Sequence, residues 1–431
     1  MLSVMMPHRR CVLSLISLAI LLVGLRHAPA SAAPVDVVSG VSPEATAANS
    51  QRKLVFAGTT VYLAYAAMDG DAERVGVATS PDGRTWLRLP LVAGLPSRLP
   101  TLAVDPQDGL HLAWTAGTRP GSVLYSRLVG GAWTPPLRLS PAEAYAGVPA
   151  MVAAREVDVV WYGIRGGRPE GYSRHDSIYE IFHTAFDGQR WSPPRLISPG
   201  SQDALNPALV ADARGTLHAF WYQSDGRVYR VRRARLRGGV WEVPQAVTGG
   251  GGDAIAPAAV ADGRGNIHLA WESREAPARI YYQRVAGDGW DAPVALSPPG
   301  SGAHRPVVTV DREGTVYVAW AQDDGHLYLR RRPRLSGTIL RLLGMGRRSW
   351  RAPERLSASG VNDYPALAAG PLVVAAWTHA GEEGRTVQTA VVPRRAPVSP
   401  IPVLVGPVLV LLVLVMIVRR YLSRPLASRP S

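Results

Sequence analysis

The chain has 431 residues, of which 47% are hydrophobic and 19% charged, and its net charge is +14. This apolar content excludes a disordered protein, and a single cysteine excludes a disulfide scaffold or a zinc site built on cysteines. With 43 glycines, 37 prolines and no collagen period, the composition favours a turn-rich β protein.

Residues 1–33 predict an export signal. Three basic residues at positions 8–10 precede an apolar run over 11–25, and residues 30–32 form an Ala-Ser-Ala sequence typical of a cleavage site. The pair of adjacent arginines leaves general secretory and twin-arginine export both open. We therefore expect a mature chain that begins after residue 33 and lies outside the cytoplasm.

A repeat fills the region 34–393. In its clearest copies a proline is followed by an aspartate five residues later and by a tryptophan fourteen residues later. These copies end at Trp114, Trp221, Trp271 and Trp320; shorter or degenerate copies end at Trp161, Trp377 and Tyr65. The end positions lie 47 to 60 residues apart, and each copy continues with an aromatic strand and a Trp near a Pro. Four short strands at this period predict an all-β fold, a β-propeller.

Seven copies predict seven blades, with a six-bladed propeller as the alternative. The seventh copy lacks a fourth strand, and residues 34–39 match that strand, so we expect them to complete the last blade and close the ring. His111, His218 and His268 recur at equivalent positions of different blades, which indicates core histidines rather than metal ligands or catalytic groups. The sequence predicts no metal and no cofactor.

One turn carries a family resemblance. Its residues are Ser80, Asp82, Gly83, Thr85 and Trp86. They resemble the Asp-box of sialidase-like, BNR-repeat propellers, and residues 187–191 keep a weaker version. The motif predicts a turn in which Asp accepts backbone N–H bonds, Gly adopts a positive φ and Trp packs between sheets. It marks a fold and not a reaction.

The resemblance to sialidases implies an alternative function, a sialidase-like glycoside hydrolase. Such enzymes hold a carboxylate with three arginines, and use a Tyr–Glu pair as nucleophile and an Asp as acid and base. Arg98 lies in an Arg-Leu-Pro sequence that looks like the first of those arginines, and Arg305 precedes a proline at a similar place. No Tyr–Glu pair matches by motif, and sialidase propellers have six blades. Non-catalytic binding is therefore the preferred interpretation, with both arginines as rim residues.

The longest connection between a second and a third strand covers residues 162–177. Long polar loops on a rigid scaffold commonly bind ligands, although a solvated loop without a ligand is the alternative. The candidate ligand-binding residues in this loop are Arg165, Arg168, Glu170, Tyr172, Arg174, His175 and Asp176. Glu272 and Arg274 occupy the matching loop of the fifth repeat. We expect the two loops to frame a mixed-charge pocket over the central channel.

Residues 330–351 contain eight arginines and no acid, between the third and fourth strands of the sixth repeat. Apolar residues interleave with these arginines, so we expect contact with anionic lipid headgroups. A disordered basic loop and a docking site for a membrane partner are the alternatives. The predicted membrane-contact residues are Arg330, Arg331, Arg332, Arg334, Arg341, Arg347 and Arg348.

The C-terminal region predicts a membrane anchor. After a linker at 394–400, residues 401–418 contain no charge and are just long enough to span a bilayer as a helix. Residues 419–431 carry four arginines and no acid, which places this tail in the cytoplasm and the repeats outside. A buried C-terminal helix is the alternative.

The net charge does not indicate nucleic-acid binding. The two ends of the chain carry seven arginines and no acid, so the repeat region has a charge of +7, and the segment 330–351 accounts for all of it. Without a global basic surface, nucleic-acid binding is disfavoured. The sequence thus predicts a propeller at the cell surface that binds a glycan or a cell-surface protein, or scaffolds a surface assembly.

Overall fold

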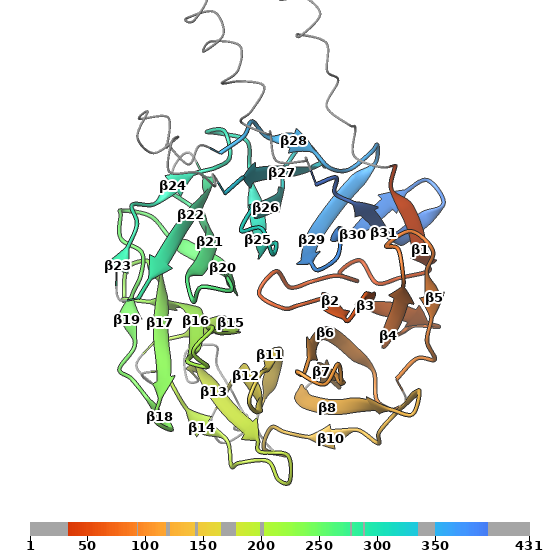
Figure 1. Cartoon of the computed structure of the whole chain (residues 1–431), viewed down its shortest axis with the longest axis horizontal. Helices are drawn as coiled ribbons and strands as arrows, with labels where there is room; N and C mark the ends of the chain where they lie inside the picture. Colours follow the sequence, from red (N-terminus) through yellow and green to blue (C-terminus); the bar gives the residue numbers. More distant parts are fainter. Residues whose placement is uncertain are drawn as a thin grey trace, which may run out of the picture. The chain divides into compact units, whose positions relative to one another are not determined.

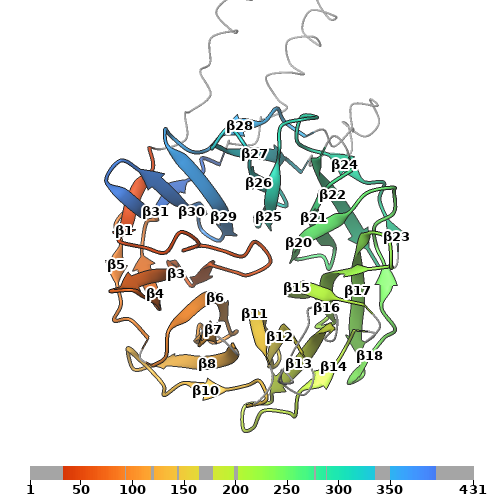
Figure 2. The ribbon, with the colours of Figure 1, turned by 180° about the vertical axis from the view of Figure 1, so that it is seen from behind.

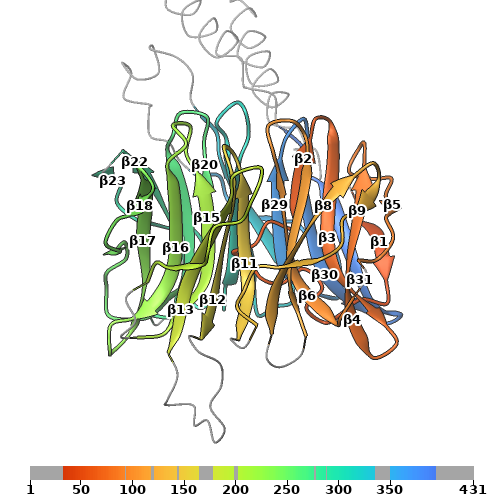
Figure 3. The same ribbon diagram turned by 90° about the horizontal axis from the view of Figure 1, so that it is seen from below.

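Seven antiparallel sheets of four or five strands surround a central axis (Figure 1). The computed structural model describes residues 33–92, 94–117, 121–142, 145–164, 178–198, 202–275, 278–287, 289–334 and 350–394. The strands of every blade run between the two faces of this ring (Figure 3). The propeller belongs to one compact unit that ends at Val392. Seven blades confirm the predicted number and exclude the six-bladed alternative.

The blades follow one another along the chain. Blade one contains β2 (Leu54–Ala57), β3 (Thr60–Asp69), β4 (Ala72–Ser80) and β5 (Leu87–Arg88). Blade two contains β6 (Ser97–Val104), β7 (Leu110–Ala116), β8 (Ser122–Val129), β9 (Ala132–Trp133) and β10 (Leu137–Arg138). Blade three contains β11 (Ala146–Ala153), β12 (Val157–Ile164), β13 (Tyr179–Phe186) and β14 (Arg195–Leu196). Blade four contains β15 (Ala204–Ala211), β16 (Leu217–Ser224), β17 (Tyr229–Arg237), β18 (Val240–Trp241) and β19 (Gln245–Ala246).

The remaining blades complete the ring. Blade five contains β20 (Ala254–Ala261), β21 (Ile267–Ser273), β22 (Arg279–Ala286), β23 (Gly289–Trp290) and β24 (Val294–Ala295). Blade six contains β25 (His304–Val310), β26 (Val316–Ala321), β27 (Leu327–Arg332) and β28 (Glu354–Arg355). Blade seven contains β29 (Val361–Ala369), β30 (Val373–Gly381), β31 (Gly384–Val391) and β1 (Val35–Ser39).

The N-terminal strand closes the ring. β1 pairs antiparallel with β31, with Val38 opposite Val387. Val38 is 7% exposed and packs in a cluster that includes Leu63 of blade one. This pairing confirms the predicted completion of the last blade. Because β1 pairs along the outer edge of β31, β31 has no unpaired edge.

The second strand of each blade supplies the core between sheets. All seven residues of β7 and of β21 are buried, which is expected for strands covered on both faces. Five of these strands contain a tryptophan that is at most 1% exposed: Trp114, Trp161, Trp221, Trp320 and Trp377. The repeated tryptophans are therefore inter-sheet core, as predicted.

A second set of tryptophans, in the outer strands, contacts the preceding blade. The ring of Trp191 meets the ring of Tyr125 in blade two edge-on, with 4.8 Å between centroids. Nε1 of Trp86 donates to Oγ1 of Thr389 in blade seven at 3.0 Å. These contacts join neighbouring blades at the outside of the ring.

The Asp-box turn has the predicted geometry. Oδ1 of Asp82 accepts the backbone N–H groups of Arg84 and Thr85, at 2.8 and 2.7 Å. The Thr85 and Arg84 hydrogen bonds lower the pKa of Asp82 to about 2. Gly83 has φ +69°, and a Cβ there would approach side-chain atoms of Val391 and Val374 closely, so the turn requires glycine.

The repeated histidines are core residues, as predicted. His111 is 2% exposed, and its ring nitrogens lie 2.7 Å from the hydroxyl of Tyr125 and 3.1 Å from Oδ2 of Asp105. His268 repeats these contacts with Tyr282 and Asp262. The ring nitrogens of His111 and His268 are thus satisfied inside the blade, whereas His218 is 4% exposed and only its Nε2 has a hydrogen-bond partner among the described residues, Asp212 at 3.3 Å.

Part of the predicted basic surface is packed within the propeller. Arg331 and Arg332 lie on β27 and are 5% and 9% exposed. Nη2 of Arg331 pairs with Glu354 at 2.7 Å, and the guanidinium of Arg332 lies 4.7 Å from the ring centroid of Tyr282. These two arginines are not surface residues, because strand alternation points them into sheet contacts.

The other predicted membrane-contact residues divide into two groups. Arg330 donates to the backbone oxygens of Arg351 and Leu296, and Arg334 is exposed. Arg341, Arg347 and Arg348 lie outside the described residues, as do nearly all of the predicted signal, linker, span and tail. Within the described ranges there is no helix with the length and apolar character needed to cross a membrane.

We expect Val38→Asp to weaken ring closure. Because Val38 is buried at the β1–β31 pair, a carboxylate there should lower the free energy of unfolding by about 3 kcal/mol or more. Chemical denaturation measures this change. Ser39→Asp is the matched control, since Ser39 is exposed on the same strand. Equal unfolding midpoints for the two variants would contradict the closing role of β1.

Candidate functional site

A β-bulge recurs in the innermost strand of blades two to seven. The strand register shifts just before each repeated proline, and the residue preceding that proline has a φ between +49° and +54°. The six bulge residues are Leu99, Val148, Asn206, Ala256, Arg305 and Tyr364. A bulge bends its strand and re-aims the side chain. All six line one cavity of about 710 Å³ at the centre of the ring, named here the bulge pocket.

The segment between β1 and β2 crosses the centre of the ring (Figure 2). We refer to residues 42–53 as the central segment. The side-chain amide of Asn49 donates to backbone oxygens of blades five and six at 2.8 and 2.9 Å. The amide of Gln51 donates to backbone oxygens of blades two and three, both at 2.7 Å. The central segment therefore forms the floor of the bulge pocket and closes the channel there.

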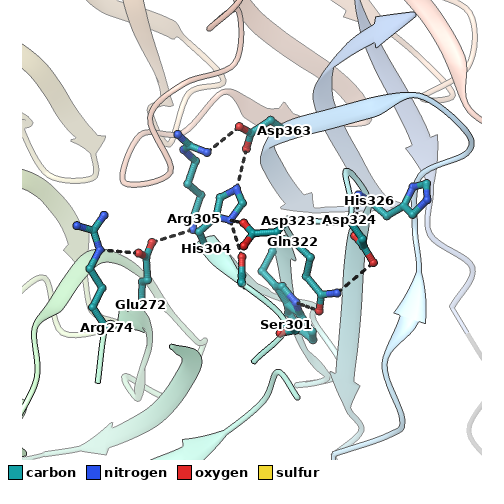
Figure 4. Close-up of polar contacts among 12 residues, drawn as sticks. Glu272, Arg274, Ser301, His304, Arg305, Gln322, Asp323, Asp324, His326 and Asp363 are labelled. Carbon is teal, nitrogen blue, oxygen red and sulfur yellow. Dashed lines mark hydrogen bonds and ion pairs between the residues drawn. The ribbon is translucent and has the colours of Figure 1, made fainter. Parts of the chain in front are cut away.

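Arg305 is the centre of the charged network in this pocket (Figure 4). Its Nη1 donates to Oδ2 of Asp363 at 2.6 Å, and its backbone N–H donates to Oε2 of Glu272 at 3.3 Å. Nε of Arg274 donates to the other oxygen of Glu272 at 3.0 Å. Blades five, six and seven are linked in this way, and both arginines are engaged by carboxylates.

Tyr364 covers one side of Arg305. The guanidinium carbon lies 4.3 Å from the centroid of the Tyr364 ring, which is a cation–π distance. The Tyr364 hydroxyl donates to Oε1 of Glu44, on the central segment, at 3.1 Å. Burial raises the pKa of Tyr364 to about 12, with Arg305 opposing and Glu44 adding to this effect. The phenol is therefore protonated at neutral pH.

His304 lies between two carboxylates. Its Nε2 is 3.6 Å from Oδ1 of Asp363, its Nδ1 is 3.7 Å from Oδ1 of Asp323, and the oxygen of Gly302 lies 2.8 Å from Nδ1. Burial alone would lower the pKa of His304, but the contacts with Asp363 and Gly302 outweigh it and raise the pKa. Burial would likewise raise the pKa of Asp363, but His304 and Arg305 together lower it.

Carboxylates and basic groups are balanced in the described lining of this pocket. The carboxylates are Glu44, Glu272 and Asp323, against Arg274, Arg305 and His304, and Asp363 pairs with Arg305 from outside the lining. The side chain of Asp323 is 79% exposed. The arrangement supplies hydrogen-bond acceptors, paired donors and the tyrosine rings of Tyr222 and Tyr364. Such a surface suits a polar, uncharged ligand better than an anion.

Two of the predicted ligand-binding residues lie in the bulge pocket, and their binding role stays a prediction. Glu272 and Arg274 do line a mixed-charge pocket over the central channel, and Arg305 joins them. The predicted loop residues Arg165, Arg168, Glu170, Tyr172, Arg174, His175 and Asp176 lie outside the described residues.

Arg98 and Arg305 are not equivalent. Arg305 is itself a bulge residue with φ +52°, whereas in blade two the bulge residue is Leu99 and Arg98 precedes it. The position of Arg98 corresponds to His304 in blade six. Arg98 is therefore absent from the described lining of the pocket, although Leu99 belongs to it.

Sequence reasoning missed Glu44, His304, Asp323, Asp363 and Tyr364. A signal for one of them was present, because Tyr364 is, beside the already predicted Arg305, the only charged or aromatic residue among the six that precede the repeated proline. Glu44 gave no such signal, since the central segment lies outside the repeats. Within the described ranges, no group of three or more His, Cys, Asp or Glu residues is placed to hold a metal ion.

Comparisons with known proteins identify the fold. No family model matches the chain, and no curated protein matches it. Among solved structures, an ulvan lyase bound to GlcA(1-4)Rha3S has a TM-score of 0.53 at 11% identity, over 83% of this chain and 96% of its own. Polysaccharide lyase Uly1 has a TM-score of 0.52 at 9% identity, over 81% and 90%. The NanB sialidase from Streptococcus pneumoniae has a TM-score of 0.42 at 11% identity, over 83% and 70%. At these identities the shared property is the propeller fold.

We expect Asp363→Asn to lower the pKa of His304, because the variant removes the carboxylate nearest to Nε2. In the wild-type protein the raised pKa means that protonated His304 stabilises the fold below its ordinary pKa of 6.5, and that this contribution is lost as the pH rises through the raised value. An NMR titration of the imidazole measures the shift. Asp324→Asn is the control, since Asp324 contacts His326 and Tyr328 instead. An unchanged titration in Asp363→Asn would contradict this assignment.

Proposed function

We propose that this protein binds a neutral glycan in the bulge pocket and does not catalyse a reaction on it. The observation that carries the proposal is the charge arrangement of the pocket. Arg274 and Arg305 are both engaged by carboxylates, and the lining also contains Glu44 and Asp323, so a substrate carboxylate would have to compete with existing ion pairs. Sugar hydroxyls, which both donate and accept hydrogen bonds, match paired carboxylates and arginines, and tyrosine rings offer apolar faces.

A saccharide ligand is compatible with this architecture. Three solved structures with TM-scores above one half are polysaccharide lyases by name, and one of them holds GlcA(1-4)Rha3S. We further propose that the propeller is exported and anchored by a helix at 401–418, with its short tail in the cytoplasm. The signal-like residues 1–33 and the uncharged stretch at 401–418 support this location.

The pocket assignment is tested with a glycan array and the purified protein. Asp323→Ala removes a solvent-exposed carboxylate that can accept hydrogen bonds, and Tyr364→Ala removes an aromatic ring of the lining. We expect each change to weaken binding of a neutral glycan at least about tenfold, the loss of one to two good polar or stacking contacts.

Asp71→Ala is the control for these variants, because Asp71 is exposed at a hairpin of blade one and does not belong to the pocket lining. Binding that survives both pocket substitutions would contradict the proposed site. Binding of no glycan at all would contradict the proposed ligand class and would favour a protein partner instead.

One observation favours the second candidate, a sialidase-like glycosidase. Tyr364 and Glu44 form a Tyr–Glu pair at 3.1 Å, with Arg305 against the tyrosine ring. In a retaining mechanism of this type the carboxylate would take the phenol proton as the tyrosine attacks the anomeric carbon. The glycosidic bond would break in the same step, and an Asp acting as the acid would protonate the departing oxygen. Against it stands the engagement of both described arginines by carboxylates, which leaves no assembled cluster for a substrate carboxylate.

The two candidates are separated by turnover of a fluorogenic sialoside. If the protein only binds, we expect no release above background from the wild type. Release that falls at least about a thousandfold in Tyr364→Phe, which loses the nucleophile and keeps the ring, would overturn the binding proposal and establish the hydrolase. Arg312→Ala, an exposed arginine at a turn of blade six, is the control.

A further inference from the structure

The central segment faces a second cavity on the side away from the bulge pocket. This channel cavity has a volume of about 390 Å³. Its walls come from the parts of the innermost strands that follow the bulges, and they include Val104, Val152, Ala211, Val260, Thr309 and Ala369. Its floor is formed by Asn49 to Lys53, and Asn49 alone of these belongs to both cavities. Small aliphatic residues dominate the walls.

Two basic side chains line the floor of this cavity, and the described lining contains no acidic residue that could pair with them. Arg52 and Lys53 line it, and none of the described lining residues is an aspartate or a glutamate. Burial lowers the pKa of Arg52 to about 10, so the guanidinium stays charged at neutral pH. A buried charge is costly unless it is paired or fully hydrogen-bonded.

Lys53 has its hydrogen-bond partners within the protein itself. This side chain, the only lysine of the chain, is 1% exposed, and its Nζ donates to Oε1 of Gln51 and to the backbone oxygen of Pro100. Burial lowers its pKa well below the ordinary value. Its two acceptors fix the amino group in place, and burial disfavours the charged form of this group.

The guanidinium donors of Arg52 are only partly used by the protein. Its guanidinium donates one hydrogen bond, from Nη2 to the backbone oxygen of Leu209 at 3.3 Å. A guanidinium has five N–H donors, so most of them remain for a ligand in the cavity. Ser50 belongs to the lining of the same cavity and is 8% exposed. Its hydroxyl is buried and has no hydrogen-bond partner in the described structure.

We propose that the channel cavity binds a small oxyanion, a carboxylate or a phosphate, held by the guanidinium of Arg52 and the hydroxyl of Ser50. The anion supplies the counter-charge and the acceptor that the described lining lacks, and planar guanidinium groups pair well with carboxylate and phosphate oxygens. This site is separate from the proposed glycan pocket, because the central segment lies between them.

Equilibrium dialysis of the full-length protein tests the site. Radiolabelled acetate and inorganic phosphate are the two probes, each at constant ionic strength, and they distinguish a carboxylate ligand from a phosphate. We expect saturable binding of one probe at one site per chain. Arg52→Gln keeps a polar side chain without the charge, and should weaken that binding at least about tenfold.

Matched variants make the result specific. Arg312→Gln removes an exposed arginine and should leave binding unchanged. Ser50→Ala removes the unpartnered hydroxyl and should weaken binding a few-fold, which provides a second readout if Arg52→Gln does not fold. Tyr364→Ala, in the other cavity, should retain anion binding, so failure of the glycan proposal and failure of this one are distinguishable.

Three results would overturn the proposal. The first is no saturable binding of either probe to the wild type. The second is equal affinity of the wild type, Arg52→Gln and Ser50→Ala. The third is complete displacement of the bound probe by an equal concentration of chloride, which would indicate a non-selective halide site in place of an oxyanion site.

Discussion

The side-chain hydrogen bonds of Asn49 and Gln51 are the constraint on which the centre of this propeller depends. The innermost strands present one unpaired edge to the channel, and backbone oxygens at such an edge need donors. Two amide side chains supply donors to four blades, at 2.7 to 2.9 Å. These bonds hold the central segment across the channel, and they thereby create two separate cavities and bring Glu44 to Tyr364.

The bulge explains how a repeated scaffold produces a single site. Six blades carry the same bulge, so each of these six blades presents one side chain to the bulge pocket. In four blades that side chain is Leu, Val, Asn or Ala, and in blades six and seven it is Arg305 and Tyr364. Chemical specificity thus arises from substitution at one structural position, while the inter-sheet tryptophans keep the blades alike.

The two cavities differ in electrostatic character although they share a floor. The described lining of the bulge pocket combines carboxylates with basic groups, whereas the described lining of the channel cavity has Arg52 and Lys53 and no acid. Charges on opposite sides of the central segment attract different classes of ligand. The central segment therefore separates the cavities both physically and electrostatically, which is the basis for assigning them a neutral saccharide and a small anion.

The sequence by itself determined the blade number, the closing strand and the local turns. These depend on short-range patterns: the spacing from Pro to Trp, the Asp-box and the recurring His and Asp, which form contacts within one blade or between neighbours. Only the tertiary structure decided the site. Asn49 meets residues more than 200 positions away, and a one-residue offset at the bulge separates Arg305 from Arg98. Burial also removed Arg331 and Arg332 from the predicted basic surface. Contacts across the channel form only when the ring closes and the bulges orient their side chains. The identities of the residues that meet there follow no repeating pattern in the sequence.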